Sequence, residues 1–94
     1  MNPKHMETGL TLLSSRLSPY VEMTAIRGSG SAQFLYVSGG ARSVEVSFDQ
    51  NNAVWVEFWS DSKDETASAA CEETFVNIEH AEKSIRDWLK GAGP

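Results

Sequence analysis

The side chains best suited to covalent chemistry are Cys71, the one cysteine, and His80, one of two histidines. A thiol beside an imidazole can act as a nucleophile with its base, but that chemistry also needs an orienting group and an oxyanion donor. No motif in the sequence supplies either. We therefore interpret Cys71 as a small, partly buried apolar residue and His80 as an exposed helical residue, and we expect no catalytic residue and no enzymatic activity.

Asp61, Asp64 and Glu65 form a compact group of potential metal ligands. Their pattern lacks the glycine and the terminal glutamate of a calcium-binding EF-hand loop, and the cysteine and histidines offer no zinc spacing. A solvated acidic loop is the preferred interpretation. The sequence therefore predicts no metal site and no cofactor.

A third group combines acids with large aromatic side chains. Trp55, Glu57 and Trp59 alternate along one apolar run, and Glu45 lies in the run before it. Exposed aromatic residues ringed by acids suit a protein-binding surface, because the aromatics supply buried contact area and the acids attract a basic partner. The structural alternative is that the tryptophans lie beneath a helix, with the acids at its rim.

These side chains must be positioned by a meander of antiparallel strands at 32–37, 43–48 and 54–59, separated by turn residues. Successive strand side chains point to opposite faces of a sheet. One predicted face is aliphatic and consists of Leu35, Val37, Val44, Val46, Phe48, Val54, Val56 and Phe58. The other face is aromatic, hydroxylic and acidic, and consists of Phe34, Tyr36, Ser43, Glu45, Ser47, Trp55, Glu57 and Trp59.

Turn residues predict the strand register. A two-residue loop at 39–40, where both residues are glycine, would set Leu35 opposite Val44 and Val37 opposite Arg42. In the next hairpin, the aliphatic side chains share one face only if the loop has three or five residues.

A five-residue loop in that hairpin places Phe48 opposite Val54 and Glu45 opposite Glu57. Like charges directly opposite each other destabilise a sheet unless they are well solvated or matched by a cation. The predicted pair of glutamates therefore marks this face as the one to examine for a partner.

A helix is predicted at 6–17, because its apolar residues fall on one stripe: Met6, Leu10, Leu13 and Leu17. Gly9 weakens this helix, Pro19 ends it, and residues 1–5 are expected to be frayed. The favoured placement puts the helix over the tryptophans. The alternative leaves the tryptophans exposed to a partner.

Two further segments complete the predicted sheet of four or five strands. Residues 20–27 alternate as a strand, whereas 66–75 reads either as a weak edge strand or as a helical turn. A second helix follows Asn77, a good N-cap, with Val76 and Ala81 as a hydrophobic staple and Gly91 at its end. Its apolar stripe is expected to pack on the aliphatic face, and residues 92–94 are expected to be frayed.

Composition sets the remaining limits. The chain has 94 residues, which predicts a single α+β domain over 1–94, and its net charge of −5 argues against a nucleic-acid or membrane ligand. A single cysteine precludes an internal disulfide, and it is compatible with a reducing cytoplasm. We therefore expect a cytoplasmic protein, as a monomer or homodimer, with a basic protein partner.

The whole chain resembles the small acidic immunity proteins of bacterial polymorphic toxin and contact-dependent inhibition systems. The similarity lies in the leading helix, in the stretch SVEVSFDQNNAVWVEFW and in the ending TFVNIEHAEKSIRDWLKG. It implies stoichiometric binding of a cognate toxin, often with occlusion of the toxin's active site, but it transfers no residue roles.

Alternatives to an immunity protein are a secretion-chaperone-like protein that binds a client segment, and a small enzyme or ligand-binding domain. From the register, rather than from the resemblance, we predict these partner-binding residues: Trp55, Trp59, Glu45, Glu57, Tyr36 and Phe34.

Overall fold

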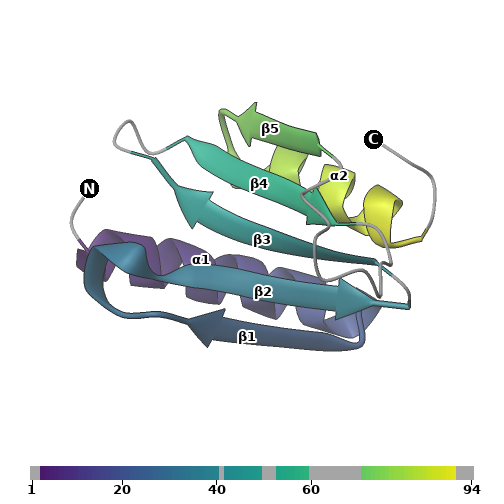
Figure 1. Cartoon of the computed structure of the whole chain (residues 1–94), viewed down its shortest axis with the longest axis horizontal. Coiled ribbons are helices and arrows are strands. Elements are labelled where there is room, and N and C mark those ends of the chain that lie inside the picture. Colours follow the sequence, from purple (N-terminus) through teal and green to yellow (C-terminus); the bar gives the residue numbers. More distant parts are fainter. Residues whose placement is uncertain (1–2, 41, 50–52, 60–70, 91–94) are drawn as a thin grey trace.

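The computed structural model describes residues 3–40, 42–49, 53–59 and 71–90. Five strands form one antiparallel sheet whose strand order follows the chain (Figure 1). The elements are α1 (Pro3–Leu17), β1 (Met23–Arg27), β2 (Phe34–Gly39), β3 (Arg42–Phe48), β4 (Val54–Trp59), β5 (Cys71–Phe75) and α2 (Ile78–Leu89). The predicted α+β architecture is confirmed.

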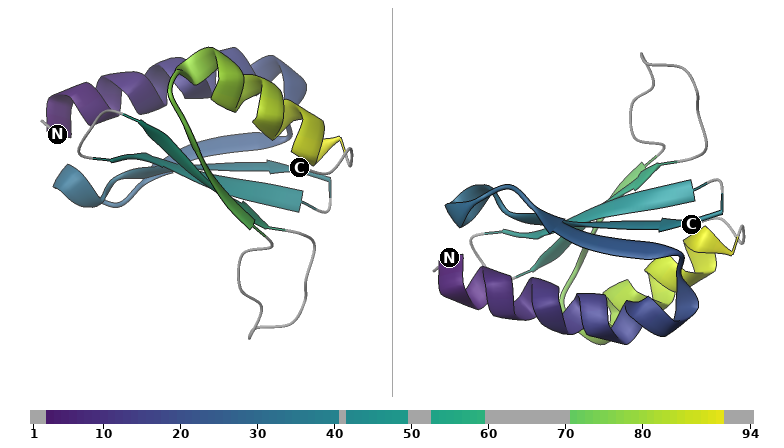
Figure 2. Two further views of the ribbon diagram at one scale, coloured as in Figure 1. Left: turned by 90° about the horizontal axis from the view of Figure 1, so that it is seen from above. Right: turned by 90° about the horizontal axis from the view of Figure 1, so that it is seen from below.

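Both helices lie on the same face of the sheet (Figure 2). The first helix, α1, contacts β1, β2 and β3, and α2 contacts β3, β4 and β5. We call this side the helix face and the opposite side the open face. No helix or strand of the described residues covers the open face, so the favoured placement of the first helix over Trp55 and Trp59 is wrong.

The width of the sheet explains this outcome. A helix is about 10 Å across and neighbouring strands lie about 4.8 Å apart, so one helix covers about two strands. Five strands therefore need both helices on their apolar side. The side chains that fill the resulting core are Leu10, Leu13, Leu17, Leu35, Val37, Val44, Val46, Val54, Val56, Phe58, Ala81, Ile85 and Trp88.

The register between β2 and β3 differs from the prediction by two residues. Val37 pairs with Val44 instead of Arg42, and Gly39 pairs with Arg42. Gly39 is thus a strand residue rather than a turn residue, and Leu89 packs over it, since an added Cβ would lie 3.4 Å from the Leu89 Cβ. A shift by an even number keeps every side chain on its predicted face.

The register between β3 and β4 is as predicted. Phe48 pairs with Val54, and Glu45 pairs with Glu57. The backbone N–H of Asp49 donates to the carbonyl of Ala53 over 3.0 Å, which closes the five-residue loop.

The first helix begins at Pro3, three residues before the predicted start, so the expectation that residues 3–5 are frayed is wrong. Proline is favoured at the first position of a helix because its fixed φ is already helical. The helix ends at Leu17, as Pro19 predicts. The predicted strand at 20–27 is shorter because Ser18–Tyr20 forms a 3-10 turn.

Asn77 caps α2 as predicted, since its side chain accepts a hydrogen bond of 2.8 Å from the backbone N–H of His80. The predicted staple is wrong, because Val76 is 84% exposed. Within the predicted segment 66–75, residues 71–75 form an edge strand, while predictions for residues 1–2, 61–70 and 91–94 fall outside the described residues.

Candidate functional site

Three glutamates stand side by side across the open face. Glu45 of β3 pairs with Glu57 of β4, and Glu57 pairs in turn with Glu72 of β5. Paired residues in a sheet share a face, so the three side chains form one line perpendicular to the strands. We call this line the carboxylate row.

Trp55 is the aromatic side chain of this face that is best presented to solvent, with 37% of its surface exposed. Its indole Nε1–H donates to Oε2 of Glu72 over 3.1 Å. The hydrogen bond ties the ring to the carboxylate row and limits its rotation. An exposed aromatic ring is thus held beside three acids.

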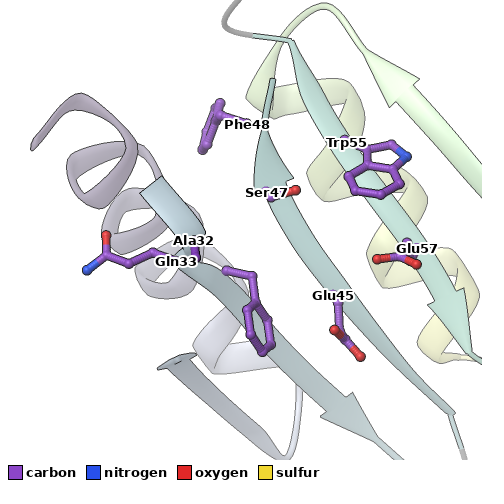
Figure 3. Close-up of a pocket in the computed structure, with 8 residues that line it drawn as sticks. Ala32, Gln33, Glu45, Ser47, Phe48, Trp55 and Glu57 are labelled. Carbon is purple, nitrogen blue, oxygen red and sulfur yellow. The ribbon is translucent and has the colours of Figure 1, made fainter. Parts of the chain in front are cut away.

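A hollow of about 340 Å³ opens on this face beside Trp55. Figure 3 shows that Trp55, Glu45 and Glu57 border the same opening. Its lining combines aromatic rings with polar side chains from three strands and the segment before β2: Ala32, Gln33, Phe34, Glu45, Ser47, Phe48, Trp55 and Glu57.

The carboxylate row is electrostatically unfavourable in the free protein. Partial burial raises the pKa of Glu57, and the charges of Glu45 and Glu72 raise it further. Three ion pairs of the described residues, Arg16–Glu82, Lys83–Asp87 and Arg86–Glu82, use acids of α2, and none of the three includes a glutamate of the row. Negative charge therefore accumulates beside the hollow.

The structure brings four of the six predicted partner-binding residues together around the hollow: Phe34, Glu45, Trp55 and Glu57. Tyr36 lies next to Glu45 on the same face, and the guanidinium of Arg27 stacks 4.4 Å from its ring centroid. Tyr36 and Arg27 therefore lie beside the hollow and are not part of its lining.

Trp59 is also on the open face, but it is partly buried. Its carbonyl accepts a 3.2 Å hydrogen bond from the indole of Trp88, which ties the end of β4 to α2. Its own indole N–H is buried without a hydrogen-bond partner among the described residues. Trp55, rather than Trp59, is the tryptophan that the hollow presents.

Sequence reasoning missed Glu72 and Arg27. The segment from Cys71 to Phe75 has apolar ends but acidic or polar side chains at all three central positions, so period-two alternation is weak there. Pairing this segment with β4 on the basis of Cys71 opposite Phe58 would have found Glu72. No local signal placed Arg27 over an aromatic ring.

The residues considered for covalent chemistry lie apart from this face. Cys71 packs against the core, and burial followed by the charge of Glu73 raises the pKa of its thiol. A raised pKa disfavours the nucleophilic thiolate. His80 is exposed in the first turn of α2 and shares no hydrogen bond with Cys71 in the described chain.

Within the described ranges, no three His, Cys, Asp or Glu side chains are grouped so as to hold a metal ion. The acids at 61–65 considered for that role lie outside those ranges. Neither described helix has the length and apolar character required to cross a membrane.

Comparison of the chain with protein-family models, curated proteins and solved structures finds no match.

Proposed function

We propose that this protein is a non-catalytic binding module that captures a basic protein on its open face. The observation that carries the proposal is the carboxylate row of Glu45, Glu57 and Glu72 beside the exposed ring of Trp55. Like charges placed opposite each other weaken a sheet, so folding alone gives no reason for three in a line. A basic partner would supply the missing positive charge.

Aromatic and acidic side chains contribute differently to such an interface. Burial of Trp55 and Phe34 against a partner would supply binding free energy, because large aromatics dominate interface hot spots. The acids would speed association by steering a positively charged surface toward the face. The net charge of −5 acts in the same direction.

The specific role we propose is that of an immunity protein which binds and neutralises a basic cognate toxin in the bacterial cytoplasm. Stoichiometric capture needs a preformed surface and no chemical step, and a twisted sheet backed by two helices is a rigid support for one. A homodimer through this face is disfavoured, because a two-fold axis would bring two carboxylate rows together.

Affinity co-purification from the native cell tests this function. The bait is the wild-type chain, compared with a Glu45→Lys, Glu57→Lys variant that inverts the charge of the row. The control is Glu73→Lys, Glu79→Lys, which changes the net charge of −5 by the same amount at two exposed positions away from the open face. Circular dichroism checks that both variants fold.

The proposal expects a basic protein in one-to-one ratio with wild type and with the control variant, and its loss with the open-face variant. Recovery that is unaffected by the open-face variant would move the interface elsewhere. A monomer that recovers no specific partner would contradict the binding function.

A further inference from the structure

The hollow on the open face is large enough to admit one long side chain of a partner. Its volume of about 340 Å³ is at the lower end of the roughly 300–1,000 Å³ found for small-molecule sites. A helix would not enter it, whereas one long side chain would. Its lining combines the aromatic rings of Phe34, Phe48 and Trp55 with polar side chains, and its two charged residues, Glu45 and Glu57, are both acidic.

The ring of Trp55 is held in a fixed orientation on which a cation can stack. Its indole N–H is already bonded to Glu72, so the ring is held in place before any ligand arrives. Preorganisation of this kind lowers the entropy lost on binding. No cation of the described residues stacks on this ring, although other aromatic rings of the chain carry one.

Those other rings show which cation stacks on aromatic side chains within this protein. Each stacked cation in the described chain is an arginine, with its guanidinium carbon 3.7–4.4 Å from the ring centroid: Arg27 on Tyr36, Arg42 on Trp88 and Arg86 on Tyr20. A guanidinium is planar and weakly hydrated, and it donates paired hydrogen bonds to carboxylates while it stacks. The ammonium group of lysine is not planar and cannot donate two parallel hydrogen bonds in this way.

We infer that the hollow takes one arginine side chain of the basic partner. Its guanidinium stacks on the indole of Trp55 and pairs with the carboxylates of Glu45 and Glu57. Glu72 is a positioning residue, because it holds the indole. This inference rests on the proposed function and adds to it the residue type on which recognition depends.

Titration with capped amino acids tests the inference without the partner. The probes are N-acetyl-arginine amide, N-acetyl-lysine amide and N-acetyl-citrulline amide, the last being a neutral mimic of arginine. The readout is the set of indole N–H signals in a proton–nitrogen NMR spectrum, which the three tryptophans supply. A Trp55→Phe variant assigns the signal of interest, and the other two serve as internal references.

The arginine probe is expected to shift the Trp55 signal saturably and to leave the other two in place. The lysine probe should need a several-fold higher concentration, and the citrulline probe should have no effect. A Glu45→Gln, Glu57→Gln variant should raise the half-saturating arginine concentration about tenfold or more, because charged hydrogen bonds are lost. The matched control, Glu73→Gln, Glu79→Gln, should not.

Equal responses to arginine and lysine would overturn the inference, as would unselective shifts of all three indole signals or undiminished binding in the Glu45→Gln, Glu57→Gln variant. The probe comparison uses the wild-type chain, so it is decisive even if a variant fails to fold. Failure of the probes with a partner still captured would refute the arginine site alone. Binding of the arginine probe without any protein partner would refute the proposed function alone.

Discussion

The two faces of the sheet are built from alternate residues of the same strands and differ in burial and charge. On the helix face, Val44, Val46 and Val56 are completely buried beneath α1 and α2. On the open face, the alternating Glu45 and Glu57 stand opposite each other and remain partly exposed. Side chains that form the core and side chains that face solvent therefore alternate along the same strands.

Magnitudes explain why this arrangement is tolerated. A fully buried aliphatic or aromatic side chain contributes about 1.5–3 kcal/mol. A like-charge pair opposed across two strands costs about 0.2–1 kcal/mol. One core residue therefore offsets both unfavourable pairs of the carboxylate row, and the core has many such residues.

Replacement of a helix-face aromatic should have the largest effect. Phe58 is fully buried, and it meets the ring of Trp88 edge to face at 5.6 Å between centroids. Phe58→Ala should lower the free energy of unfolding by about 3–5 kcal/mol, through lost burial and a cavity. Urea denaturation measures this; a loss below about 1 kcal/mol would contradict the assignment of the core to this face.

Replacement of the residue that caps α2 should lower the stability of the protein by a smaller amount. Asn77→Ala removes the acceptor of the His80 N–H and should lower the free energy of unfolding by about 1 kcal/mol. Asn77→Ser is the matched control, because serine also caps and should restore most of the loss. Equal losses in both variants would show that the cap is not the cause.

Replacement of the open-face aromatic should affect binding far more than folding. Trp55→Ala removes an exposed ring and its hydrogen bond to Glu72, and should cost less than about 1 kcal/mol of stability while abolishing capture of the basic partner. Denaturation and co-purification are measured on the same sample. Collapse of the fold in this variant would place Trp55 in the core and erase the contrast between the faces.

The smallest expected effect is an increase in stability. Glu57→Gln removes the middle charge of the carboxylate row and should raise the free energy of unfolding by roughly 0.2–1 kcal/mol at neutral pH. The pKa of Glu57 is raised in the folded chain, so the folded protein takes up this proton at a higher pH than the unfolded chain does.

The destabilisation caused by the charge of Glu57 is thus fully present above the raised pKa of the folded state. It is lost as the pH falls through that pKa and Glu57 is protonated. The stability difference between Glu57→Gln and wild type should therefore shrink as the pH is lowered from 7 toward the ordinary glutamate value of 4.5. Denaturation of both proteins at several pH values measures this, with Glu73→Gln as control. A difference that grows on acidification would show that the row does not strain the sheet.

Much of the sheet could be predicted because side-chain parity is a local property. The strands alternate so regularly that the sequence predicts the correct face for residues 34–37, 43–48 and 54–59, although the predicted register of the first hairpin is off by two residues. The pairing of Glu45 with Glu57 followed from the same parity. Four of the six candidate binding residues consequently line the hollow.

The errors concern contacts between distant segments. Gly9 looked like a weakness of the first helix, but the ring of Phe48 packs so closely on it that a Cβ there would lie 2.7 Å from the ring. Gly39 looked like a turn residue, but Leu89 of α2 packs over it inside a strand. Neither contact is visible without the packed helices, because each glycine meets a residue far away in the chain.

The sequence by itself determined which strand side chains share a face, that the first helix ends at Leu17, that Asn77 caps the second, and that one face is acidic and aromatic. These features depend on period, turn chemistry and charge alone. Only the tertiary structure decided that both helices share the apolar side, since that depends on the width of five paired strands. It alone added Glu72 to the acids and fixed the ring of Trp55 beside them. Which face of the sheet is exposed follows only from the full arrangement of strands and helices, because a side chain is exposed when no other part of the protein packs over it.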